Sequence, residues 1–131
     1  MTVTLIRAPQ LAPAPYASAA TLPVDARLLF LAGSCPLADD GTVVPGGIAA
    51  QTTRALDNLE AALLAAGAAL TDVVATRVLV ASTDQAHLIE AWNVVHERFG
   101  AHDVPSTLCG VTVLGYPGEL VEIEATAGVI D

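Results

Sequence analysis

Three side chains that could do chemistry stand near the end of the chain. Thr107 offers a hydroxyl, Cys109 a thiol and Glu122 a carboxylate. Residues 107–114 and 120–130 are rich in β-branched and aliphatic side chains, and they predict two strands with a turn between them. Because a short turn joins strands that are neighbours in a sheet, we expect the three groups to lie close together in one small site.

Each of these groups also has a structural interpretation. Glu122 could orient water as a general base, or it could belong to a solvated face that it shares with Glu124. Cys109 has no basic neighbour in the sequence that would activate a thiol, so the wall of a pocket is its favoured role. Cys35 follows an earlier predicted strand, where lining a site and simple packing are equally good interpretations.

Composition and charge narrow the class of protein. The chain has 131 residues, 53% of them hydrophobic, and we expect a single domain over residues 1–131. Five basic residues stand against fourteen acidic ones, so the surface repels phosphates, and we expect no binding to nucleic acid or to a membrane. No apolar run is long enough to span a bilayer and no signal peptide is evident, which favours a cytoplasmic protein with reduced cysteines over one with a disulfide.

No metal or organic cofactor is expected. The histidines do not combine with either cysteine in a spacing typical of metal sites, and we expect all three to lie on a solvated helix face: His87, His96 and His102. No serine stands in a nucleophile elbow, so a serine hydrolase is not expected either.

Hydrophobic periodicity predicts the remaining elements. Residues 48–66 predict a helix that Gly67 ends, with a buried stripe made of Ile48, Thr52, Leu56, Leu59 and Leu63. The opposite, polar side of this helix is expected to carry Gln51, Arg54, Asp57 and Glu60. Residues 82–99 predict a second helix, capped by Ser82, with a buried stripe made of Leu88, Trp92, Val95 and Phe99. Residues 2–6, 26–32 and 72–81 predict further strands, and the order β-β-α-β-α-β-β indicates an α+β fold.

Two helices can cover only one face of such a sheet. On the last strand, one face is aliphatic and the other carries Glu122 and Glu124; the strand at 72–81 is apolar on both faces apart from Thr76 and Arg77. Aliphatic surface that the helices leave bare needs another cover, so we expect self-association through the open face, with Glu122 at or near a subunit interface.

Several segments together resemble the Rid/YjgF family of reactive-intermediate (enamine/imine) deaminases. They run nearly from end to end of the chain: Pro15, Tyr16, residues 31–36 (LAGSCP), Gln51, 55–59 (ALDNL), 65–67 (AAG), 70–74 (LTDVV), Trp92, Asn93, Phe99, Pro105, Cys109 and 121–125 (VEIEA). The combination is specific, although no single segment is. The resemblance implies a chorismate-mutase-like fold with a mixed sheet and two helices on one face. It also implies a homotrimer that binds a small metabolite in clefts between subunits.

The resemblance also assigns site residues. Glu122 matches the glutamate that orients the attacking water, while Tyr16, Ser34 and Cys109 are implied as ligand-binding residues. In active deaminases of the family, an arginine that binds the substrate carboxylate stands where this chain has Thr107. Thr107 has one hydroxyl and no charge, so a standard 2-iminopropanoate deaminase is not expected, and a neutral or differently shaped ligand is favoured. The alternatives are a decayed pocket, a retained deaminase, and Arg77 as a replacement for the missing charge.

Two functions remain open. In the first, a Rid-like trimer binds a small metabolite and hydrolyses an imine, enamine or related electrophile, with Glu122 as the base toward water. In the second, the same trimer is a non-catalytic ligand-binding or chaperone-like protein.

Overall fold

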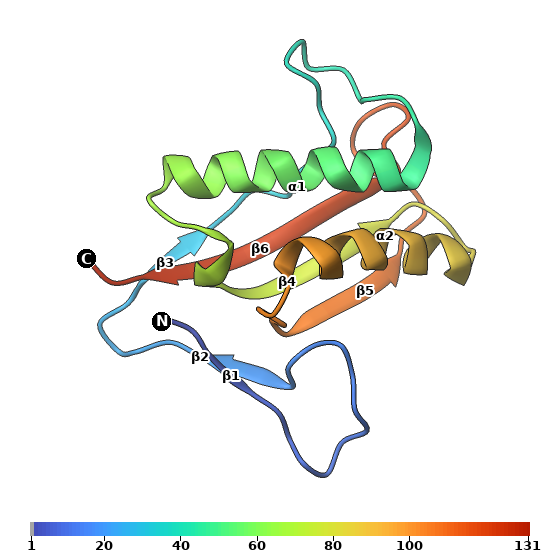
Figure 1. Ribbon diagram of the computed structural model, residues 1–131. Coiled ribbons are helices and arrows are strands. Elements are labelled where there is room, and N and C mark those ends of the chain that lie inside the picture. Colours follow the sequence, from blue (N-terminus) through green and yellow to red (C-terminus); the bar gives the residue numbers. More distant parts are fainter. Residues whose placement is uncertain (1) are drawn as a thin grey trace.

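The computed structural model describes residues 2–131 and has the predicted α+β architecture (Figure 1). Its elements follow in the order β1 (Thr4–Ile6), β2 (Ala19–Thr21), β3 (Arg27–Phe30), α1 (Gly47–Ala65), the short 3-10 helix η1 (Leu70–Asp72), β4 (Val73–Val80), α2 (Gln85–Phe99), β5 (Ser106–Gly110) and β6 (Val121–Val129). Strand β2, which pairs with β1 in a separate two-stranded sheet, is not predicted by the sequence.

The main sheet has four strands in the order β3-β6-β4-β5, and only β4 and β5 run parallel. The hairpin predicted between the last two strands is therefore wrong, because β4 lies between β5 and β6. The reason is that α2 connects β4 to β5, and a helical crossover sets the second strand parallel beside the first. Strand β5 ends at Gly110, and residues 111–120 carry the chain to the other side of β4.

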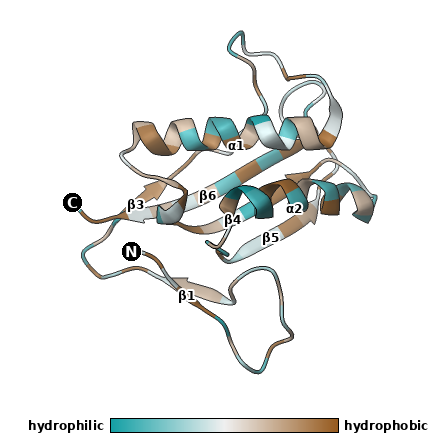
Figure 2. Ribbon diagram, viewed as in Figure 1, coloured by the Kyte–Doolittle hydropathy of each residue, from teal (hydrophilic) through white to brown (hydrophobic). Residues whose placement is uncertain are grey.

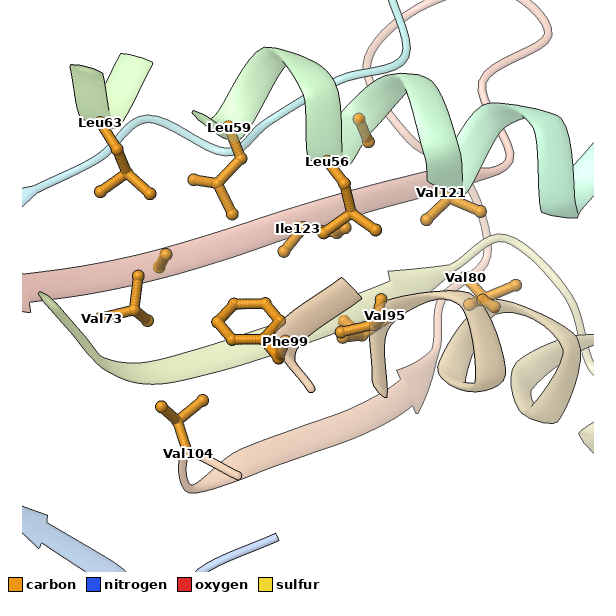
Figure 3. Close-up of a cluster of buried hydrophobic side chains, with 14 of the residues drawn as sticks. Leu56, Leu59, Leu63, Val73, Val80, Val95, Phe99, Val104, Val121 and Ile123 are labelled. Carbon is orange, nitrogen blue, oxygen red and sulfur yellow. The ribbon is translucent and has the colours of Figure 1, made fainter. Parts of the chain in front are cut away.

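The core lies between the two helices and one face of this sheet (Figure 3). The stripe predicted for α1 is buried throughout: Ile48, Thr52, Leu56, Leu59 and Leu63. The same core receives one face of β6: Val121, Ile123, Ala125, Ala127 and Val129. In α2 the predicted Val95 and Phe99 are buried, but Leu88 and Trp92 are only partly buried and Ala91 is fully enclosed.

The ends of the helices agree with the sequence except at one cap. Gly67 and Gly100 follow the two helices with φ of +80° and +61°, a region that glycine adopts without steric cost. The N-cap of α2 is Asp84, whose Oδ1 accepts from the backbone N of Ala86 at 2.9 Å, and not Ser82 as predicted. No helix within residues 2–131 is both long enough and apolar enough to cross a membrane.

The opposite face of the sheet is not covered by the helices, as the sequence predicts (Figure 1). Hydrophilic and hydrophobic bands alternate along β6 (Figure 2), in step with its alternating burial. On β3, Leu28 is 53% and Phe30 is 79% exposed, and both are in register with open-face positions of β6. Leu22 packs against Gly128 and covers a small part of this face.

Two residues that the sequence places on solvated helix surfaces are buried instead. His102 lies just after α2 with its Nε2 2.8 Å from the carbonyl oxygen of Val73. Gln51 of α1 is turned toward the start of β6, where its amide bonds the backbone. Both side chains satisfy backbone groups that would otherwise be buried without partners.

Candidate functional site

One cluster of acidic side chains stands at the start of β6. Cys35, Glu119 and Glu122 each offer one atom, and these atoms lie within 4.8 Å of one another. The Cys35 thiol donates to Oε1 of Glu122 at 3.1 Å. Glu122 is half-buried on the open face of the sheet, while Glu119 precedes the strand and is only 4% exposed. We call these three residues the acidic cluster.

Glu119 is the most enclosed member of the acidic cluster. Its Oε1 accepts from the backbone N of Tyr116 at 3.2 Å, which folds the side chain back over the 116–119 turn. Its Oε2 is buried and has no hydrogen-bond partner among residues 2–131. A buried carboxylate oxygen without a donor is unfavourable, so some positive group or proton is expected there.

Polar side chains of α1 fix the backbone around the acidic cluster. Gln51 donates to the carbonyl of Gly118 at 3.0 Å and accepts from the backbone N of Leu120 at 2.7 Å. These two hydrogen bonds fix the backbone on both sides of Glu119. Asn58 donates to the carbonyl of Cys35 at 2.9 Å. The helix therefore sets the direction of both segments that deliver the acidic cluster.

Residues 33–35, which follow β3, approach Glu122 closely. Ser34 pairs with Ile123 of β6 through two backbone hydrogen bonds of 2.7 and 3.0 Å. A Cβ at Gly33 would collide with the Glu122 carboxylate, so glycine is required for this approach. The Ser34 hydroxyl donates to the carbonyl of Ala55 at 2.6 Å, which anchors the segment to α1.

Burial and the neighbouring carboxylates suppress the ionisation of Glu119 and of the Cys35 thiol. Burial, reinforced by Glu122, raises the pKa of Glu119 above the ordinary value of 4.5. Burial and then the neighbouring carboxylates raise the pKa of the Cys35 thiol well above its usual range. Without a cation, the thiol stays protonated near neutral pH, so Cys35 is a hydrogen-bond donor there and not a nucleophile.

A larger cleft of about 610 Å³ opens between the N-terminal segment and the edge of the main sheet. Tyr16, Arg77 and Thr107 line it together with Arg7. The Tyr16 ring packs edge-on against Trp92 with ring centroids 6.1 Å apart, so Tyr16 has both roles weighed from the sequence, packing and lining a cleft. We call this the arginine cleft.

Among the five arginines, Arg77 makes the longest ion pair. It stands directly beside Thr107 in the register of β4 and β5, on the open face. Its only ion pair within residues 2–131 is a long one of 3.4 Å to Glu124. The other arginines make ion pairs of 2.6 to 2.9 Å: Arg7, Arg27, Arg54 and Arg98. Arg77 can therefore turn toward an anion in the arginine cleft at little cost.

The structure divides the site residues predicted from the sequence between two places. Tyr16 and Thr107 line the arginine cleft, while Ser34 and Glu122 belong to the region of the acidic cluster. Cys109 and Glu122 both stand opposite Leu79, on either side of β4, so two strand spacings of about 4.8 Å separate them. Within one chain, the predicted single site of Thr107, Cys109 and Glu122 is therefore not formed.

Glu119 is a member of the acidic cluster that the sequence does not indicate as a site residue. It stands outside the alternating pattern of β6 and has no partner at a recognisable spacing, because Cys35 is far away in the chain. One signal was available: a carboxylate stands directly after the turn glycine Gly118 and two residues before β6, whose first residue Val121 is buried. The surroundings of that carboxylate come from distant segments: Ser34 pairs with Ile123 beside β6, which brings Cys35 near, and Gln51 holds the backbone around Glu119.

Comparison with known sequences identifies relatives of this chain. The family model described as Endoribonuclease L-PSP matches residues 6–129. A 2-iminobutanoate/2-iminopropanoate deaminase of Rattus norvegicus is 30% identical over 102 residues, which cover 77% of this chain and 72% of the relative. RutC family protein PH0854 of Pyrococcus horikoshii is 38% identical over 101 residues, which cover 76% of this chain and 77% of the relative.

Solved structures agree with these sequence matches. YyfB of Yersinia pestis, described as a Rid family protein of unknown function, superposes with a TM-score of 0.85 at 30% identity and covers 98% of this chain and 100% of its own. Rv2704 of Mycobacterium tuberculosis, a member of the YjgF/YER057c/UK114 family, has a TM-score of 0.67 at 34% identity and covers 97% and 99%. The predicted chorismate-mutase-like fold is thereby confirmed, and the chain belongs to the Rid/YjgF family, whose sequence model is described as endoribonuclease L-PSP.

Proposed function

We propose that this protein binds a small metabolite and adds water to an imine, an enamine or a related electrophile, with Glu122 as the base that orients the water. The observation that carries the proposal is the placement of Glu122. Its carboxylate is half-buried, is held by the Cys35 thiol at 3.1 Å and lies against Gly33, where no side chain fits. A carboxylate fixed in this way can accept a proton from water without reorganising first.

The arginine cleft supplies the binding half of the proposed site. It is large enough for a small metabolite, and it combines the Thr107 hydroxyl, the Tyr16 ring and the weakly paired charge of Arg77. Thr107 makes a standard 2-iminopropanoate deaminase unexpected. Arg77, one strand away on the same face, is the group best placed to meet an anionic ligand instead.

A second copy of the chain would bring the two halves together. The acidic cluster and the arginine cleft are separate within one chain, and the exposed side chains of Leu28 and Phe30 leave the open face apolar at one edge. Association through that face buries this surface, and the proposed trimer would place the arginine cleft of one subunit near Glu122 of the next.

The separation of the two halves also favours the alternative function. Glu122 does not line the arginine cleft of its own chain, so a protein that binds a ligand there without turnover is the second candidate. The two candidate functions differ in whether a ligand bound in the arginine cleft lies close enough to Glu122 for that carboxylate to act as a base.

Ammonia release from 2-imino acids, generated in the assay by an amino-acid oxidase, separates the two candidates. We expect little acceleration by the wild type with 2-iminopropanoate, and a clear gain with Thr107→Arg, which adds the bidentate anchor. Adding Glu122→Gln to that variant should lower the rate by about 100- to 10,000-fold, the usual contribution of a general base. Glu90→Gln, on the exposed surface of α2, is the charge-matched control.

The outcomes assign the function directly. If Thr107→Arg and its double variant with Glu122→Gln are equally active, Glu122 is not the base. If Thr107→Arg binds 2-oxobutanoate, a stable analogue, yet gives no ammonia, the remaining machinery is not catalytic and the binding-protein candidate stands.

A further inference from the structure

We propose that Cys35, Glu119 and Glu122 form a binding site for a zinc-like divalent cation. The inference goes beyond the proposed function, because cation binding is measured without any substrate. It starts from the geometry of the acidic cluster, whose three ligand atoms lie within 4.8 Å of one another although Cys35 is distant from the other two in the chain.

The spacing suits a tetrahedral metal. Zinc bonds of about 2.0 to 2.3 Å place two ligand atoms roughly 3.3 to 3.8 Å apart. The Cys35 Sγ lies 3.1 Å from Oε1 of Glu122, and the third ligand atom lies within the 4.8 Å limit of both. Side-chain rotations that move the ligand atoms by a few tenths of an ångström to about one ångström would complete the three-ligand geometry.

The buried oxygen of Glu119 points independently to a missing partner. Glu119 is 4% exposed, and its Oε2 has no hydrogen-bond partner among residues 2–131. Within residues 2–131 no arginine supplies a cation to this oxygen, because each of the five pairs with a carboxylate outside the acidic cluster. A bound divalent ion would satisfy the oxygen and cancel the repulsion between Glu119 and Glu122.

The donor set selects the kind of metal. Two carboxylate oxygens alone would suit magnesium or calcium, but these hard cations prefer a complete set of oxygen ligands. A thiol that becomes a thiolate on binding favours zinc and cobalt instead. Three protein ligands leave a fourth position free, which is typical of zinc sites that are open to water or small molecules.

A cavity of about 280 Å³ opens beside Cys35 and is lined by Gly33, Asn58 and Tyr116 among others, while Glu119 and Glu122 are not part of its lining. Water or a small molecule would approach a bound cation from the Cys35 side. A cation bound to Glu122 would also withdraw that carboxylate from proton transfer. Zinc is therefore expected to inhibit the hydrolysis proposed above, and a chelator should restore it.

The experiment is a titration of chelator-treated protein with zinc alone, followed by calorimetry, with the metal content of the gel-filtered product measured by elemental analysis. We expect one zinc per chain. Titration with cobalt should produce a thiolate-to-cobalt charge-transfer band, which reports on Cys35 directly. Zinc binding without that band would overturn the assignment of Cys35 as a ligand, and the absence of stoichiometric zinc binding would overturn the site.

Two pairs of variants locate the ion. Cys35→Ser and Glu119→Gln should each weaken zinc binding by about 100-fold, at least as much as the loss of a group behind a metal ligand. The controls are Cys109→Ser, which removes the other thiol, and Glu90→Gln, which removes a surface carboxylate; both should bind as the wild type does. Equal affinity of Cys35→Ser and Cys109→Ser would contradict the proposal, and circular dichroism of each variant confirms that the fold is intact.

Discussion

The two faces of β6 differ in what their residues do, although they alternate along the same nine residues. The face toward the helices consists of Val121, Ile123 and the alternate positions after them, all of them buried in the core. The opposite face carries Glu122, which accepts from the Cys35 thiol, and Glu124, which pairs with Arg77. One face of this strand therefore belongs to the core, while the other carries the candidate catalytic carboxylate.

This difference predicts which substitutions affect the fold and which affect the clefts. Substitutions on the helix-covered face disturb a packed core, so they affect folding. Substitutions on the open face change charge and shape in clefts while the backbone register stays in place. Thr107 and Arg77 are both on the open side, where a change of ligand costs the fold little.

The sharpest contrast is between neighbouring residues of β6. Ile123→Ala removes a side chain that is fully buried under α1, so unfolding should require about 2 to 5 kcal/mol less free energy. Glu124→Gln, the next residue on the open face, should change it by no more than about 0.5 kcal/mol. Urea denaturation measures both. Similar losses for the two variants would mean that the two faces do not differ in their contribution to stability.

The open face should instead respond in assembly. Phe30→Asp places a charge on the exposed apolar edge, and we expect at least a tenfold weaker self-association with little effect on the fold of the subunit. Light scattering after gel filtration gives the mass, with Ile89→Asp on the exposed surface of α2 as the matched control. A wild type that is monomeric, or a trimer that both variants leave intact, would refute association through this face.

The smallest expected effect is on how stability depends on pH, and it comes from Glu119, just before β6. The pKa of Glu119 is raised in the folded chain by burial and by Glu122, so folding favours its protonated form. Its contribution to stability is then fully present below the ordinary value of 4.5 and is lost as the pH rises through the folded value. With a chelator present, the wild type should lose stability relative to Glu119→Gln between pH 4.5 and neutrality. Parallel pH profiles of the two proteins would exclude this role for Glu119.

Much of the fold follows from local patterns in the sequence. The stripe of α1, the two glycines that follow the helices and the buried face of β6 depend on residues within a few positions of each other. Predictions of side-chain exposure from the same local patterns were wrong where a side chain has a distant partner. Gln51 and His102 read as solvated, yet their partners are backbone groups of β6 and β4.

The candidate site was only partly predictable for the same reason. Glu122 and Tyr16 were found through the resemblance to the Rid/YjgF family, but Glu119 was not, because its surroundings come from the 33–35 segment and from Gln51. Within one chain, Thr107 and Glu122 do not stand on neighbouring strands as predicted, because strand order in a sheet is not encoded by neighbouring turns alone.

The amino-acid sequence by itself determined which residues can form helices, strands and turns, the acidic surface charge and the absence of arginine at position 107. Tertiary structure alone decided that β4 separates β5 from β6, that Arg77 lies beside Thr107, and that Cys35 meets Glu119 and Glu122. The physical reason is range: periodicity and capping act within a few turns of chain, whereas strand order and buried charge clusters arise when distant segments compete for the same core.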